Sequence, residues 1–239
     1  MSEFFLELFS EEIPVNLQKN TREILLKNFK DFFEKENIIF SGKSLSFSTP
    51  NRLLILFDGI KPEIHQKEEE IRGPKTDAPE KALDGFLRSN NFQKKNLYQK
   101  ENDKGIFYFA KKPPKIIKIY DLLNENIPLI LDKASWKKSM KWGDFELYWG
   151  RPLKSILAVF NNKNLTFKYH HLQSSNSTLI DKDFEDKKKI FNNFKIYIDY
   201  FKKSKVIIDQ NKRKKFIETQ LAKISKKKNL TVEINNKLL

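Results

Sequence analysis

The sequence predicts an α+β fold: an N-terminal β-α-β-β unit, then a mixed or antiparallel sheet region, then a basic helical C-terminal segment. Three observations lead to this prediction. Short apolar runs typical of strands flank segments with helical apolar spacing, and Gly, Pro and Asn clusters separate them as turns. Lysine becomes dense only towards the C-terminus. Because 39% of the 239 residues are hydrophobic, the chain can bury a sizeable core without disulfides.

The N-terminal unit begins with an apolar run at residues 4–9, which predicts a buried strand. Ser10, two acidic residues and Pro14 follow, and such residues favour the start of a helix. Apolar residues then recur at spacings of three, four and seven, so we expect a helix from Val15 to about Glu36. Two strands on either side of a Pro-Asn turn complete the unit, at 45–49 and 53–57.

The middle of the chain contains further helix and strand patterns. Residues 80–90 place apolar side chains on one side of a helix, and Gly105 ends a turn between two short strands. Residues 116–131 predict a helix that continues up to Pro128. Strands are then expected at 145–149, 155–160 and 165–169, which favours a mixed or antiparallel sheet.

Two basic helices are expected near the C-terminus. Apolar residues between Ile190 and Phe201 form one helical stripe, and most lysines lie off that stripe. A second helix is expected from Asn211 to about Ser225, with basic residues near its start that oppose the helix dipole. Residues 187–228 carry 15 basic side chains against three acidic ones, a density that attracts polyanions.

These elements divide the chain into four expected segments. They are a β-α-β-β unit at 1–60, a charged connector at 61–79, an α+β domain at 80–183 and a basic helical segment at 184–239. Net charge separates the two ends of the chain. It is −4 over residues 1–80 and +19 over the remainder, which together give the +15 of the whole chain.

Composition excludes several classes of protein. With no Cys and only three His, the chain is a poor candidate for a zinc, iron–sulfur or Cys-nucleophile site. Its apolar runs are far too short to cross a membrane, and its first residues lack the features of a signal peptide, so we expect a cytoplasmic protein. The seven glycines stand singly, so no Gly-rich phosphate loop can be built.

Titratable residues offer no catalytic or metal site. Adjacent carboxylates such as Glu11 and Glu12 are typical of a solvated surface. His170 and His171 end an expected strand, whose alternation would point the two rings to opposite faces. We therefore expect no catalytic residue, no metal site and no cofactor bound by this chain.

The segment from Ser135 to Asp144 is distinctive, with two Trp, three Lys and one Gly in ten residues. Indole rings beside lysines can hold single-stranded nucleic acid by base stacking and phosphate contact. In the alternative interpretation, Trp136 and Trp142 anchor the core and the lysines extend into solvent. The sequence leaves both interpretations open.

Five short motifs follow one another along the chain. They are Leu6-Glu7-Leu8 with Ser10 to Pro14, Thr49 to Leu53, Arg72-Gly73-Pro74, Lys81-Ala82 with Gly85-Phe86, and Lys138 to Gly143 with Arg151-Pro152. In this order and spacing they resemble the N-terminal part of the bacterial glycyl-tRNA synthetase beta subunit. One run departs from that family: after Thr178, where members tend to have Gly-His-Arg-Phe, this chain has Leu179 to Phe184.

The resemblance implies an α2β2 synthetase. Its alpha subunit makes glycyl-adenylate and holds ATP and Mg²⁺, while its beta subunit binds tRNA(Gly) and supports assembly. The chain alone is then expected to be inactive, and further HD-like and anticodon-binding domains are expected beyond Leu239. The alternative is a free-standing RNA-binding or ribosome-associated module without a ligase role.

With tRNA as the implied partner, the candidate contact residues are aromatic or basic. They are Trp136, Lys137, Lys138, Lys141, Trp142, Arg151, Lys212, Arg213 and Lys214. Arg52 and Arg72 are candidates for structural or partner contacts. Because arginine is scarce in this chain and Arg52, Arg72 and Arg151 lie close to Pro or Gly, we expect bidentate geometry there, either in an intramolecular clamp or in a direct contact.

Overall fold

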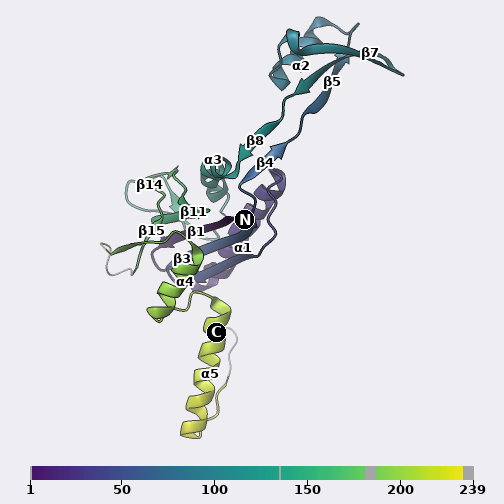
Figure 1. Cartoon of the computed structure of the whole chain (residues 1–239). Coiled ribbons are helices and arrows are strands. Elements are labelled where there is room, and N and C mark those ends of the chain that lie inside the picture. Colours follow the sequence, from purple (N-terminus) through teal and green to yellow (C-terminus); the bar gives the residue numbers. More distant parts are fainter. Residues whose placement is uncertain (1, 135, 181–186, 234–239) are drawn as a thin grey trace. The chain divides into compact units, whose positions relative to one another are not determined.

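The computed structural model describes residues 2–134, 136–180 and 187–233. The chain forms two compact units (Figure 1). Unit 1 consists of residues 1–62 and 119–239, and unit 2 consists of residues 63–118. Unit 2 is therefore an insertion between two segments that fold together.

A five-stranded antiparallel sheet forms the centre of unit 1, in the order β12-β11-β1-β3-β2. The strands are β1 (Ser2–Ser10), β2 (Ser44–Thr49), β3 (Arg52–Ile60), β11 (Leu153–Phe160) and β12 (Lys163–Asn164). Because β1 is the middle strand, Glu7 has Leu54 as its neighbour on one side and Leu157 on the other. The sheet thus joins the N-terminal segment to a strand from far along the chain.

Helices cover both faces of this sheet. On one face lie α1 (Val15–Lys35) and α3 (Ile119–Asp132), which contact each other. Phe29 and Phe33 of α1 pack on Phe4 and Phe57 of the sheet, with ring centroids 4.6 to 6.5 Å apart. Alternation along β1 sends neighbouring residues to the opposite face.

The opposite face is covered by α4 (Phe194–Lys203). Tyr197 and Phe201 of this helix are buried, and the Tyr197 ring meets Phe5 of β1 edge to face at 4.9 Å. The Asn193 side chain caps the helix by accepting the Ile196 N–H. Unit 1 therefore has three layers: helices, sheet and helix.

Helix α5 (Gln210–Lys228) follows α4. The Asp209 carboxylate accepts the N–H groups of Asn211 and Lys212, and its negative charge offsets the basic start of the helix. Its described side chains are not buried, and Phe216 is 53% exposed.

Three short antiparallel pairs complete unit 1. They are β9 (Met140–Lys141) with β10 (Tyr148–Trp149), β13 (Lys168–Tyr169) with β14 (Leu172–Gln173), and β15 (Ser177–Leu179) with β16 (Lys188–Ile190). Strands β14 and β15 contact β11. The β13–β14 and β15–β16 pairs therefore lie beside β11 of the central sheet.

Unit 2 contains two small sheets and helix α2 (Glu80–Asn90). Strand β4 (Glu63–Gln66) pairs with β8 (Lys115–Lys118), and β5 (Glu69–Lys75), β7 (Gly105–Lys112) and β6 (Leu97–Asn102) form a sheet in the order β5-β7-β6. A short 3₁₀ helix, η1 (Lys94–Asn96), precedes β6. Helix α2 lies on β5, where a Cβ on Gly73 would come within 3.0 Å of the Phe86 ring.

The predicted α+β class and the β-α-β-β unit are confirmed. Helices α1 and α2 lie within one residue of their predicted ranges, because their apolar spacing is a local property. The start of α1 differs: it follows Pro14 with no side-chain cap, and Ser10 belongs to β1.

The structure divides the chain differently from the four predicted segments. Residues 61–79 do not form a connector, because they contain β4 and β5. Residues 80–183 are not one domain: part of them completes unit 2, and β11 joins the sheet of the N-terminal unit. The predicted boundary between 183 and 184 lies outside the described residues.

Several local predictions also need correction. Residues 116–118 belong to strand β8, and α3 continues through Pro128 to Asp132. Ile190 ends β16 instead of beginning a helix. The strands expected at 145–149 and 165–169 are only two residues long, because tertiary pairing decides where a ladder forms.

Candidate nucleic-acid interface

Trp136 anchors the aromatic and lysine-rich segment to the protein. Its half-buried ring meets the buried Trp149 ring edge to face, with centroids 5.0 Å apart. A Cβ on Gly150 would overlap the Trp136 ring, so this close packing requires glycine. Trp136 therefore packs against the protein interior, which is the second of the two interpretations given for this residue.

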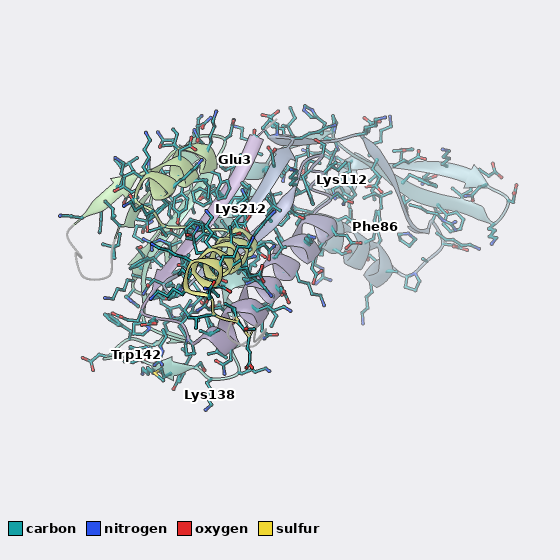
Figure 2. All side chains as sticks on the ribbon, turned by 90° about the horizontal axis from the view of Figure 1, so that it is seen from below. Glu3, Phe86, Lys112, Lys138, Trp142 and Lys212 are labelled. Atoms are coloured by element: carbon teal, nitrogen blue, oxygen red, sulfur yellow. The ribbon has the colours of Figure 1, made fainter. Side chains whose placement is uncertain are left out.

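Trp142 lies on the loop between β9 and β10, with 36% of its surface exposed. Lys137 and Lys138 are exposed as well, and Figure 2 shows Lys138 and Trp142 near each other at one edge of the view. Lys141 is exposed, and its ammonium lies 2.8 Å from the Glu146 carboxylate. This segment therefore presents an indole surface and several cations to solvent.

A cavity of about 530 Å³ lies beside Trp142, and we call it the aromatic cavity. Its walls come from the β9–β10 loop, β11, the turn before β14 and the β15–β16 pair. The aromatic and basic residues that line it are Trp142, Phe145, Trp149, Lys154, His171 and Lys188. The described lining residues include no Asp or Glu.

Phe145 and His171 form a flat pair on the wall of this cavity. Their ring centroids lie 3.7 Å apart and their planes differ by 9°. Burial, with a smaller contribution from the charge of His170, lowers the pKa of His171 below 6.5, so this ring is neutral at pH 7. The His170 Nε2 lies 3.7 Å from the Asp132 carboxylate, so the two histidines have different partners.

Arg151 lines a second hollow of about 760 Å³, together with Trp142 and the turn that joins β1 to α1. Its Nε donates a hydrogen bond of 3.2 Å to the carbonyl of Glu12. Arg151 thus braces this turn, and its half-buried side chain lines the same hollow as Trp142.

Arg213 on α5, one of the predicted tRNA contacts, donates hydrogen bonds within the protein. Its Nη1 donates to two carbonyls just before the helix, at 2.7 and 3.3 Å, and its Nη2 donates to the carbonyl of Ser48 at 2.9 Å. Burial lowers the pKa of this guanidinium. Arg213 therefore fastens α5 to β2, whereas Lys212 is exposed and Lys214 lies 4.0 Å from Glu218.

Arg52 belongs to a buried polar group that we call the Glu7 cluster. The hydroxyls of Thr178 and Tyr197 donate to the two carboxylate oxygens of Glu7, and the Arg52 Nε lies 3.4 Å from one of these oxygens. The Arg52 Nη2 also donates to the carbonyls of residues 179–180, at 2.6 and 3.0 Å. Burial raises the pKa of Glu7, and the Arg52 charge and the two hydroxyls oppose that rise. Arg52 is therefore an intramolecular clamp.

Arg72 lies in unit 2, on β5. Its guanidinium carbon is 3.7 Å from the centroid of the Phe107 ring, a cation–π contact, and its side chain is exposed.

The structure brings Trp142 together with residues that the sequence did not single out as RNA contacts. Phe145, Trp149 and His171 share the aromatic cavity with it. Only the aromatic density after Trp142 hinted at this site, because His171 comes from a different turn. Of the departing run, residues 181–184 lie outside the described residues, whereas the carbonyl of Leu179 is held by Arg52.

Among the described residues, no group of three His, Cys, Asp or Glu side chains is placed to hold a metal ion. No helix in this part of the chain is long and apolar enough to cross a membrane.

Comparison with known proteins identifies relatives over the whole chain. The family model described as glycyl-tRNA synthetase beta subunit matches residues 4–239. The glycine–tRNA ligase beta subunits of Rickettsia felis (strain ATCC VR-1525 / URRWXCal2) and Rickettsia peacockii (strain Rustic) are 36% and 37% identical to this chain over 241 and 239 residues. Each alignment covers 100% of this chain and 36% of the relative, so the chain spans about a third of the length of these proteins. The chain belongs to the glycyl-tRNA synthetase beta subunit family.

Proposed function

We propose that this chain contributes tRNA binding and subunit assembly to the beta subunit of a tetrameric α2β2 glycine–tRNA ligase. The observation that carries the proposal is the exposure of Trp142, Lys137 and Lys138 beside the aromatic cavity, in a chain of this family. Indole rings and ammonium groups are the groups that contact the bases and phosphates of an RNA strand.

The binding test uses the full chain and tRNA(Gly), because β1 pairs with β11 and the two halves of the chain share one sheet. If about six phosphates are neutralised, affinity falls on the order of a thousandfold between 50 and 200 mM salt. A flat salt response contradicts the proposal.

A double variant locates the contact. Lys137→Ala with Lys138→Ala should weaken tRNA binding and reduce the magnitude of the salt slope by about one per lysine that contacts a phosphate. The matched control is Lys19→Ala with Lys30→Ala, which removes the same charge from exposed positions of α1. Equal losses in both variants would mean that the lysines act only through total charge.

The catalytic residues, ATP and Mg²⁺ are proposed to belong to the alpha subunit, which this chain meets in the cytoplasm. The chain alone should therefore not charge tRNA(Gly) with glycine and ATP. Aminoacylation above background by the purified chain contradicts this assignment. Co-purification with the alpha subunit supports assembly and separates the proposal from a free-standing RNA-binding module, which would bind RNA without that partner.

A further inference from the structure

We propose that the aromatic cavity takes up one unpaired base of an RNA strand. The inference rests on the proposed tRNA binding and adds the site and the chemical group that it receives. The cavity volume of about 530 Å³ lies within the range of small-molecule sites, so a single base can enter it.

The aromatic cavity offers a surface on which a base can stack. The Phe145 and His171 rings lie nearly parallel at 3.7 Å and present a flat pair on one wall. His171 is neutral at pH 7, so the pair offers π surface without a charge. Trp142, from the β9–β10 loop, supplies a second aromatic wall that is partly exposed. A base has a π face whatever its identity, so such walls suit any of the four.

The charged side chains among the described lining residues are lysines. Lys154 and Lys188 line the cavity, and no carboxylate is among its described lining residues. Lys188 is exposed on β16, and Lys154 is held by Glu11 at 2.5 Å. An aromatic lining that carries an exposed lysine, with no carboxylate among its described residues, favours a ligand that is flat and joined to an anion, which describes a nucleotide.

The lysines of the lining favour an RNA strand over a free nucleotide. Lys154 is paired with Glu11, so the exposed lysine of the described lining is Lys188 on β16, and one ammonium matches a single phosphate beside a base better than a clustered triphosphate. The base must be unpaired, because a base within a duplex cannot place its face against side chains.

The Glu7 cluster holds one wall of the aromatic cavity in place. Leu179 lines the cavity, and its carbonyl accepts a 2.6 Å hydrogen bond from the buried Arg52. The wall that carries Leu179 is therefore fixed to the central sheet. Arg52 acts here as a positioning residue and touches no ligand.

The experiment measures the affinity of the full chain for a single-stranded RNA that carries 2-aminopurine, whose fluorescence falls when it stacks. Trp142→Ala and His171→Ala should each weaken binding by about 5- to 140-fold, the equivalent of 1–3 kcal/mol for one stacked base. Both variants should also lose the fluorescence change. His171→Phe should retain both, because it keeps the ring.

The matched control is Tyr148→Ala. Tyr148 lies on β10, is 63% exposed and does not line the cavity, so this variant should bind within twofold of the unmodified chain. Thermal melting of every variant shows that the fold is intact. A fully paired RNA hairpin with a minimal loop should bind more weakly and be indifferent to Trp142→Ala.

The outcomes separate the two proposals. If tRNA binds with a steep salt dependence but Trp142→Ala and His171→Ala match Tyr148→Ala, the base site is overturned and tRNA binding stands. If the chain binds no RNA, both are overturned. If AMP binds the cavity as tightly as the oligonucleotide does, the assignment to a strand is overturned.

Discussion

Unit 1 and unit 2 place similar polar groups at opposite depths. In unit 1, Glu7 and Arg52 are buried, with 0% and 6% of their surface exposed. In unit 2, Glu70 accepts hydrogen bonds from Tyr98 and from Lys100 at the surface. Water can replace a lost partner in the second case and cannot in the first, so the same kind of substitution should have very different costs.

The two units also differ in the apolar residues that they bury. Unit 1 packs fully buried Phe rings on both faces of its sheet, among them Phe4, Phe5 and Phe57. In unit 2 the buried apolar residues are Leu87, Phe107, Phe109 and Ala110. The Glu7–Arg52 pair of unit 1 is therefore part of a core, whereas the Glu70–Lys100 pair of unit 2 is a surface contact on a small sheet.

The largest effect is expected for Arg52→Met. This change leaves the Glu7 carboxylate buried without its cation and should lower the free energy of unfolding by about 3–5 kcal/mol at pH 7. The penalty should shrink as pH falls towards 4.5, because burial raises the pKa of Glu7 and the carboxyl group takes up a proton in the folded state, so that the unpaired charge disappears. Denaturant unfolding at several pH values measures both effects.

Arg72→Met is the control in unit 2. Its guanidinium stacks on Phe107 at the surface, so the expected loss is only about 0.5–1 kcal/mol, without the same pH dependence. Equal losses for the two arginines would remove the distinction between the units.

A smaller effect is expected for Gly150→Ala in unit 1. The added Cβ would overlap the Trp136 ring, and such overpacking costs about 1–3 kcal/mol. Gly85→Ala in α2 is the matched change, because a Cβ there meets nothing within 4 Å, and it should stabilise unit 2 slightly. Melting temperatures of the two variants should therefore move in opposite directions, and a common direction would contradict the close packing at Gly150.

The smallest effect is expected for Tyr98→Phe, which removes a hydroxyl and keeps the ring that stacks on Phe109. The hydrogen bond from Tyr98 lowers the pKa of Glu70, and Lys100 lowers it further. The stabilisation that Glu70 gives through these contacts is therefore present above pH 4.5 and is lost as pH falls further. The same bond raises the pKa of Tyr98 to about 12, so its stabilisation is lost as pH rises from 10 to about 12.

Melting temperature against pH tests this prediction. The difference between the unmodified chain and Tyr98→Phe should be greatest between about pH 5 and pH 10. Tyr148→Phe, also on an exposed side chain, should show no such window. A constant difference across pH would mean that the hydroxyl acts through packing instead of through Glu70.

The sequence by itself determined the α+β class, the β-α-β-β unit, helices α1 and α2 and the family resemblance. The class, the unit and the helices follow from short-range properties: apolar spacing along a helix, alternation along a strand and residues suited to tight turns. The resemblance follows from short motifs that stand in the order of the family. The aromatic and lysine pattern around Trp142 also directed attention to the loop that lines the aromatic cavity. Local patterns suffice where neighbours in the sequence are neighbours in space.

Only the tertiary structure decided which distant segments meet. In the tertiary structure, β1 pairs with β11, and the expected connector contains β4 and β5. Arg213 fastens α5 to β2 through its hydrogen bond to Ser48. The tertiary structure also brought Trp142 and Phe145 of the β9–β10 loop together with His171 of the turn before β14 around one cavity. Strand partners and side-chain neighbours depend on burial and on the satisfaction of buried polar groups across the whole chain, which no local spacing encodes.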